Sequence, residues 1–248
     1  LYRSGTCGDN LAWTLDNSST LTISGTGDMY DFTYDETGSC TSPWVDYRSM
    51  IRSIAIGSGV TYIGAWAFED TNITSLTIPG SVTAIGDHGI DGNRYLTELT
   101  LNKGLRSIGK EAFSYSKRLT TVTIPDGVTT IGAGAFASCV GWLPETESDT
   151  GLTTVTIPGS VTSIGKDAFA DNQLLATVNF DGTQEQWNAA GGKNAGVPSS
   201  ATFNCVKVAA SGSCGTGVKW SLASNGVLTI TGKGTMPDYN PGKAPWAS

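Results

Sequence analysis

The sequence predicts a mostly-β solenoid of stacked short repeats with a β-hairpin module at each end, and two observations lead to this prediction. A unit of 22–23 residues recurs about five to six times over residues 51–180, with apolar side chains at fixed positions. The segments that begin at Ser4 and Ser211 are copies of each other. A unit this short cannot bury its own apolar face, so neighbouring units must stack around a continuous core.

Each repeat contains one expected strand followed by a turn. The clearest copies read LTTVTIPDGVTTIGAGAF from Leu119 and LTTVTIPGSVTSIGKDAF from Leu152. Alternating apolar and polar residues in LTTVTI indicate a strand buried on one face. The proline that follows, as at Pro125, ends the strand because proline cannot donate to a ladder. Stacking then builds an extended parallel sheet along one side, and no helix is required within the array.

Stacking also places equivalent side chains about 4.8 Å apart, so phenylalanine should lie on phenylalanine. The position near the end of the unit is occupied by Phe68, Ile90, Phe113, Phe136 and Phe169. We expect these side chains to form a column inside the solenoid.

The two terminal copies predict a hairpin with a buried tryptophan. Trp13 aligns with Trp220, and Asn225-Gly226 in the second copy is a strong turn signal between two strands. Solenoids need end caps that shield the terminal core, and such a hairpin suits that role.

The chain therefore divides into three parts. Residues 1–42 are expected to form an N-terminal β-hairpin capping module, and residues 43–204 the repeat solenoid with its closing segment. Residues 205–248 should be a truncated second copy of the module, after which the natural chain continues. Ser42-Pro43 favours the start of a short helix before the first repeat. The segment 182–188 should form a helical turn that seals the far end with Trp187.

The repeat resembles the BspA-type leucine-rich repeats of bacterial surface proteins, whose pattern is close to LTxVxIPxxVTxIGxxAF. The resemblance covers residues 51–180, about half of the chain, and it recurs five times. It implies a leucine-rich-repeat solenoid in an exported, often cell-wall-attached protein that serves adhesion or host contact.

The composition of the chain excludes several classes of partner. The formal net charge is −7, and the 15 Lys and Arg residues are scattered, which argues against a nucleic-acid partner because phosphates need clustered cations. No apolar run approaches the roughly 18 residues needed to span a bilayer, so we expect no membrane insertion. A single histidine and the absence of C-x-x-C spacing predict neither a metal nor a cofactor. We expect an extracellular monomer, secreted or attached to the cell surface.

Catalysis is not predicted. A nucleophilic triad needs a histidine, and the only one is His88, at a repeat position that holds Trp66 and Glu111 in neighbouring units; we expect it to be an exposed loop residue. Paired carboxylates could cleave glycosides, but the repeat is not expected to fix two of them opposite each other. The acidic run Asp28–Asp31 could hold calcium, although a solvated loop is the simpler interpretation.

The five cysteines leave at least one thiol unpaired within the chain. Two pairings are open, Cys7 with Cys40 and Cys205 with Cys214, and export would make both chemically possible. The second module lacks a counterpart of Cys40, so the module does not require the first bridge.

Two surfaces are candidates for ligand contact, and the first is the outward face of the sheet. It is a polar, nearly flat surface of small side chains, whose threonines also suit plain strand formation. Its candidate contacts are Thr77, Thr100, Thr123 and Thr156.

The second candidate is a ten-residue insertion in the fourth repeat, at residues 139–151. Insertions in solenoids map to surface loops, which often carry function. Its candidate contacts are Trp142, Leu143, Glu145 and Glu147, and an exposed tryptophan is a frequent contact anchor. The alternative is that Trp142 folds back onto the solenoid. Stacking already specifies the repeat turns, so we expect contact at the insertion and not at the turns.

The sequence thus favours a binding or adhesion module, not an enzyme, that recognises a protein or glycan through its repeat surface. A structural spacer that holds another domain away from the cell wall is the alternative, and a hydrolase is a third. Clustered exposed aromatic residues would favour a binding module. A uniformly polar surface would favour a spacer, and convergent carboxylates in a cleft would favour an enzyme.

Overall fold

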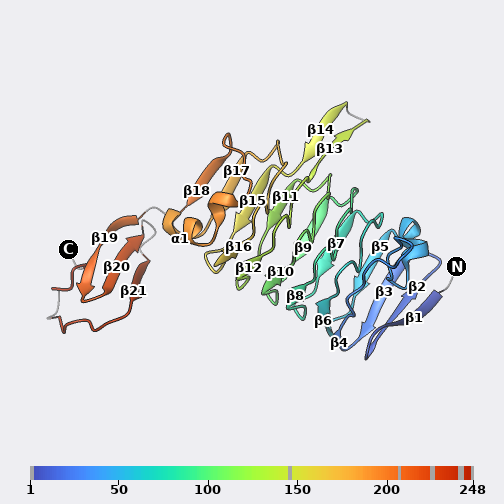
Figure 1. Ribbon diagram of the computed structural model, residues 1–248, viewed down its shortest axis with the longest axis horizontal. Coiled ribbons are helices and arrows are strands. Elements are labelled where there is room, and N and C mark those ends of the chain that lie inside the picture. Colours follow the sequence, from blue (N-terminus) through green and yellow to red (C-terminus); the bar gives the residue numbers. More distant parts are fainter. Residues whose placement is uncertain (1–2, 145–146, 206–207, 224–226, 240–242, 247–248) are drawn as a thin grey trace.

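The chain forms an elongated stack of repeats, seen along its length in Figure 1. The computed structural model describes residues 3–144, 147–205, 208–223, 227–239 and 243–246. Each complete repeat adds one strand to each of two parallel ladders that run along the stack. No helix among the described residues is long and apolar enough to cross a membrane. The fold is therefore the mostly-β solenoid that the repeats predict.

The first ladder contains the strands that the LTTVTI-like runs predict. In chain order these are β5 (Ser53–Ile56), β7 (Ser75–Ile78), β9 (Glu98–Leu101), β11 (Thr121–Thr123), β15 (Thr154–Ile157), β17 (Thr177–Phe180) and β18 (Thr202–Cys205). The register is that of the repeat, with each strand offset by one unit from the next. Hydrogen-bonded pairing is interrupted between β5 and β7 and again between β9 and β11. The expected single extended sheet is thus divided into three hydrogen-bonded parts.

A second ladder of very short strands was not predicted from the sequence. It contains β4 (Gly27–Asp28), β6 (Val60–Ile63), β8 (Ala84–Ile85), β10 (Ser107–Ile108), β12 (Thr130–Ile131) and β16 (Ser163–Ile164). These six strands form one uninterrupted parallel sheet. Most of them are two residues long, so they show no alternation that a sequence pattern could reveal.

The turn after this ladder is left-handed at the same place in every unit. Trp66, His88, Glu111, Gly134 and Asp167 all have φ between 51° and 62°. Only one of these residues is glycine, and the left-handed region costs other residues roughly 1 kcal/mol. Backbone bonds between repeats offset that cost, for example from the His88 amide to the Lys110 carbonyl at 2.8 Å. The turn therefore aims equivalent side chains in one direction along the stack.

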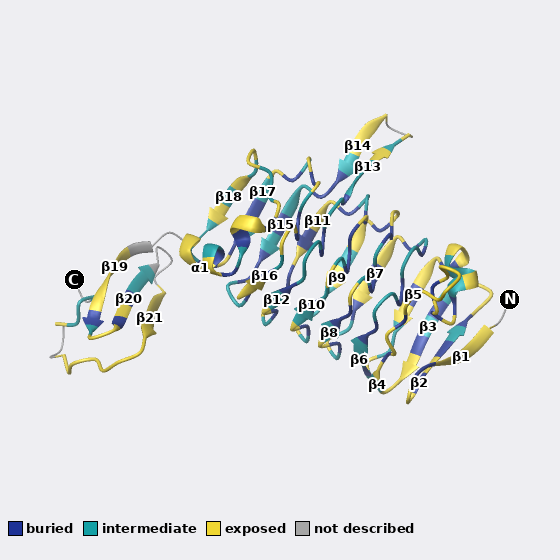
Figure 2. Ribbon diagram, viewed as in Figure 1, coloured by how far each residue is buried: buried dark blue, intermediate teal, exposed yellow. Residues whose placement is uncertain are grey.

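Phenylalanines stack in the core as the repeat predicts. Ring centroids lie 5.1 Å apart for Phe113 and Phe136 and 5.8 Å apart for Phe136 and Phe169, with nearly parallel planes. Figure 2 shows the buried residues along the inside of the stack. The same core reaches from Cys7 in the first module to Ala195 near the closing segment.

A second column inside the stack is polar, and the repeat pattern did not predict it. It consists of Thr71, Asn93, Ser116, Cys139 and Asn172, each at most 1% exposed. Asn93 Nδ2 donates to the Phe68 carbonyl at 2.8 Å, and Asn172 Nδ2 to the Phe136 carbonyl at 2.7 Å. Leaving such a buried carbonyl unpaired would cost about 1–3 kcal/mol. The column therefore satisfies backbone groups at the turn that carries the phenylalanines.

The N-terminal module is joined to the solenoid as well as covering it. Its strands β1 (Arg3–Gly8), β2 (Leu11–Leu15) and β3 (Thr20–Gly25) are antiparallel to one another, and β3 then pairs in parallel with β5. Trp13 is buried against Trp44, as a capping hairpin requires. The short helix that follows is 3₁₀, η1 (Val45–Met50), with Trp44 at its N-cap and not Ser42.

A capped helical turn closes the far end of the stack, as the sequence predicts. The helix α1 (Gln184–Ala189) begins with a capping box between Thr183 and Gln186, and a 3₁₀ turn, η2 (Gly192–Asn194), follows. Trp187 is buried against Phe180 and Phe203. The aromatic cluster therefore covers the last complete repeat.

The C-terminal module has the same three-stranded antiparallel sheet as the N-terminal one. Its strands are β19 (Val208–Gly215), β20 (Val218–Ala223) and β21 (Leu228–Gly232). It has a small core of its own, in which Cys214, Val218 and Trp220 are buried with Trp246 beside them. The Asn225-Gly226 turn lies outside the described residues.

All five cysteines are free, so neither the Cys7–Cys40 nor the Cys205–Cys214 bridge is present. Burial raises the pKa of Cys7 to about 11 and that of Cys139 to about 12. Cys139 belongs to the polar column, where its thiol contacts the Phe113 carbonyl at 3.3 Å. This cysteine is a core residue and not a reactive thiolate.

Replacing Phe136 with alanine should remove the ring in the middle of the phenylalanine column. We expect a loss of roughly 3–5 kcal/mol in the free energy of unfolding, because the neighbouring rings on both sides keep the cavity open. Chemical denaturation followed by circular dichroism measures it. The exposed Tyr115, replaced with alanine, serves as the control. Equal losses in the two variants would show that the register is wrong.

Candidate binding site

The insertion in the fourth repeat forms a β-hairpin that projects from the stack (Figures 1 and 2). Its strands are β13 (Val140–Leu143) and β14 (Ser148–Gly151), paired antiparallel with Trp142 opposite Asp149. Cys139 and Leu152, directly before and after the hairpin, are fully buried. The hairpin therefore leaves and re-enters the core at fixed points without disturbing the repeat register.

The candidate residues of the hairpin differ in exposure. Trp142 is 58% exposed, so the alternative in which it folds back onto the solenoid is wrong. Leu143 is half-buried and Glu147 is exposed. Glu145 lies outside the described residues.

A groove of about 450 Å³ lies beside the hairpin. It is lined by Arg94, Tyr95, Lys117, Arg118, Gly141, Trp142, Pro144 and Thr150. Arg94 and Lys117 hold the same place in successive repeats, as do Tyr95 and Arg118, so the stack brings these turn residues together. Turns and hairpin therefore line one groove, whereas ligand contact at the insertion and not at the turns stays a prediction.

Close packing fixes the hairpin against the floor of this groove. A Cβ atom added to Gly141 would lie 2.9 Å from Cβ of Lys117, closer than side chains normally approach. Glycine at this position lets β13 lie directly on the neighbouring turn. Trp142, the next residue, is one of the residues that line the groove.

The described residues that line the groove have a net charge opposite in sign to that of the whole chain. Three of these side chains, Arg94, Lys117 and Arg118, are cationic, and none of the described ones is a carboxylate, whereas the chain carries −7. The Arg118 guanidinium carbon lies 5.5 Å from the centre of the Tyr95 ring, within cation–π range. Cations beside exposed aromatic faces suit a ligand with anionic groups on a flat or ring-shaped body.

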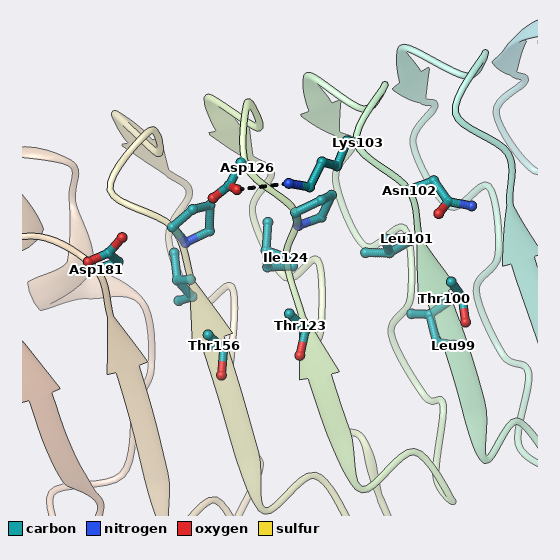
Figure 3. Close-up of a pocket in the computed structure, with 13 residues that line it drawn as sticks. Leu99, Thr100, Leu101, Asn102, Lys103, Thr123, Ile124, Asp126, Thr156 and Asp181 are labelled. Carbon is teal, nitrogen blue, oxygen red and sulfur yellow. Dashed lines mark ion pairs between the residues drawn. The ribbon is translucent and has the colours of Figure 1, made fainter.

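The threonine face contains a second groove, of about 480 Å³, which Figure 3 shows. Thr100, Thr123 and Thr156 line it, whereas Thr77 is not among its lining residues. It lies where the ladder between β9 and β11 is interrupted, and there Leu99 is only half-buried. The face is therefore not the nearly flat surface that the sequence predicts.

This second groove is weakly charged. Lys103 Nζ lies 3.5 Å from an oxygen of Asp126, and both side chains are at least 75% exposed. An exposed pair of this kind contributes little, about 0–1 kcal/mol. Asp181 also lines the groove, so its described lining contains one cation and two carboxylates and is only weakly acidic.

The carboxylates of the acidic run at residues 28–31 make hydrogen bonds within the fold. Asp28 accepts a hydrogen bond from the Thr61 hydroxyl at 2.5 Å. Asp31 accepts from the Tyr62 hydroxyl and from the Ala65 amide, both at 2.7 Å. These carboxylates join the cap to the first repeat, so neither a calcium loop nor a freely solvated loop describes them.

His88 is not the exposed loop residue that the sequence predicts. Its side chain is 13% exposed, and its ring stacks on Trp66 with centroids 3.8 Å apart and planes 5° apart. Its Nδ1 lies 3.2 Å from Asp91 Oδ2 and 3.7 Å from Glu111 Oε2. Burial raises the pKa of Asp91 above its ordinary value. Replacing His88 should therefore cost about 0.5–1.5 kcal/mol of aromatic stacking, and not nothing.

These contacts also overturn the expectation that the repeat fixes no two carboxylates together. Asp91 and Glu111 come from successive repeats, and their ligand atoms and that of His88 lie within 4.8 Å of one another. The sequence feature that indicates this cluster is the one-repeat offset of 23 residues between His88 and Glu111. Both residues occupy the same left-handed turn.

Comparison with known proteins agrees with this architecture. A family profile described as the BspA type leucine-rich repeat region matches residues 46–142 and 147–189, in six copies. The chain belongs to the BspA-type leucine-rich-repeat family. The resemblance and the fold class that the repeats predict are therefore confirmed, and a search of curated proteins found no match.

Two solved structures are similar to this BspA-type protein. A leucine-rich repeat protein from Eubacterium ventriosum is 25% identical with a TM-score of 0.62, over 73% of this chain and 44% of that one. A leucine-rich cell surface protein from Faecalibacterium prausnitzii is 22% identical with a TM-score of 0.45, over 91% and 60% of the two chains. The present chain thus spans less than half of the Eubacterium protein.

Deleting residues 140–149 should leave the repeat stack intact. The deletion joins the buried Cys139 to the last residues of β14 and restores the 23-residue period, so we expect the free energy of unfolding to change by less than about 0.5 kcal/mol. Thermal denaturation of the deletion variant beside the full chain measures this. A loss above about 2 kcal/mol would instead make the hairpin part of the core.

Proposed function

We propose that this BspA-type chain is an extracellular binding module, secreted or attached to the cell surface, that holds an acidic glycan or protein in the groove beside its hairpin. One observation carries the proposal: the exposed Trp142 lies at a groove whose described lining residues include three cations and no carboxylate. The module acts as a monomer and as a site of adhesion. The support for its location is its family and its composition.

The groove favours binding over the other two functions. A spacer would present a uniformly polar surface, whereas Trp142 and Tyr95 are both large and exposed beside one groove. A hydrolase that uses paired carboxylates would need them at the groove, and the described lining contains none. Exposed aromatic groups beside arginine are the side chains most enriched at binding hot spots.

The threonine groove of Figure 3 is the second candidate contact surface. Its support is the interrupted ladder between β9 and β11, which leaves Leu99 and Leu101 half-buried among polar side chains. A neutral ligand would suit this groove better than an acidic one.

Binding of the chain to heparin, compared with its binding to uncharged dextran, tests whether the ligand is acidic. An array of glycans and matrix proteins, probed with the chain, then identifies the ligand. We expect heparin to bind and dextran not to bind. Trp142→Ala and Arg118→Gln should each weaken binding by about tenfold or more. Raising the salt concentration should weaken it further because the groove is open to solvent.

Thr123→Ala is the matched control, since it changes the second groove and leaves the first one intact. Array ligands that bind Trp142→Ala as well as the unchanged chain, but bind Thr123→Ala poorly, would move the site to the threonine groove. Array ligands that are uncharged and insensitive to salt would contradict the acidic-ligand proposal.

A further inference from the structure

We propose that His88, Asp91 and Glu111 form a zinc-binding site at the left-handed turns of two successive repeats. One ligand atom from each of the three residues lies within 4.8 Å of the other two. The histidine nitrogen lies 3.2 Å and 3.7 Å from the two carboxylate oxygens. Tetrahedral zinc with bonds near 2.0–2.2 Å holds its ligand atoms about 3.3 Å apart, so only small movements would close the site.

The repeat architecture holds the ligands in place. His88 and Glu111 occupy the same left-handed turn position one repeat apart, so both side chains leave the backbone in the same direction. The face of the imidazole lies flat on Trp66, which fixes the plane of the ring. The Ser114 hydroxyl donates to Asp91 Oδ1 at 2.6 Å and leaves Oδ2 directed at the histidine. Such supporting contacts are a regular feature of metal sites.

The charge of the cluster favours a cation. With a neutral imidazole, the two carboxylates give a formal charge of −2, and the side chains of His88 and Asp91 are each only 13% exposed. Lys110 Nζ lies 3.2 Å from Glu111 Oε1 and neutralises part of this charge. That contact uses the other oxygen of Glu111, so Oε2 stays on the side of the histidine.

The ligand set points to zinc rather than to calcium or magnesium. Calcium and magnesium take oxygen ligands almost exclusively, whereas one imidazole nitrogen with two carboxylate oxygens suits zinc. Three protein ligands leave a fourth position open to water or to a group of a bound partner.

Isothermal titration of the full chain with zinc chloride, in a buffer free of chelators, tests the site. We expect one zinc ion per chain. His88→Ala and Glu111→Gln should each reduce the affinity by more than tenfold, and Ser114→Ala by roughly tenfold because it only orients Asp91. Glu111 is the more exposed ligand, so its variant keeps the test valid if the loss of stacking prevents His88→Ala from folding.

Two control variants separate this site from other metal binding. Asp167→Asn changes the equivalent left-handed position two repeats along, where the carboxylate is half-exposed, and it should bind zinc as the unchanged chain does. Cys205→Ser removes the one cysteine that is not buried and should also bind normally. The proposal is overturned if the unchanged chain takes up no zinc, if Glu111→Gln binds as tightly as the unchanged chain, or if Cys205→Ser abolishes binding.

Discussion

Backbone hydrogen bonds between each repeat and the next are the constraint on which the rest of this structure depends. The amide of Phe113 donates to Ala135, and that of Phe136 to Ala168, both at 2.8 Å. These bonds set the spacing at which phenylalanine rings stack and at which buried asparagines reach the carbonyls of the preceding turn. They also stabilise a left-handed residue in every unit, which isolated turns would rarely adopt without glycine. Local sequence and long-range pairing thus specify the same register.

The same register assembles both surface sites from residues far apart in the sequence. Arg94 and Lys117 line one groove because they occupy the same turn in successive repeats. His88 and Glu111 approach each other for the same reason at another turn. The repeat thus aligns any residues that occupy equivalent positions, and the insertion adds Trp142 without changing that alignment.

Much of the fold could be predicted from the sequence because the core positions repeat and the pattern could be checked several times over. The strands at LTTVTI, the phenylalanine column and the helical closure at Trp187 all follow from apolar spacing and capping signals. The two-residue ladder could not be found, because two residues are too few to show a period. The apolar pattern is the same on both sides of the interruption between β9 and β11, so it does not predict that break in the ladder.

The candidate sites were harder to predict, because they depend on which side chains share an edge of the stack. Trp142 could be identified as an unusual residue in an insertion, but its cationic neighbours come from turns that appeared to be only structural. His88 appeared solvated because its repeat position varies, yet that variation places Trp66 and Glu111 on either side of it. Position-by-position comparison of successive turns would have revealed both clusters.

Hydrogen exchange across the fourth repeat tests most directly whether the hairpin is an addition to a rigid stack. We predict that the amides of Gly132, Gly134 and Phe136, which bond to neighbouring repeats, exchange only on global unfolding. Amides at the tip of the hairpin, around Leu143 and Ser148, should exchange orders of magnitude faster. Equal protection of these amides and the hairpin amides, or fast exchange at Gly132, Gly134 and Phe136, would contradict the claim that stacked repeats form the scaffold on which the hairpin and its groove are built.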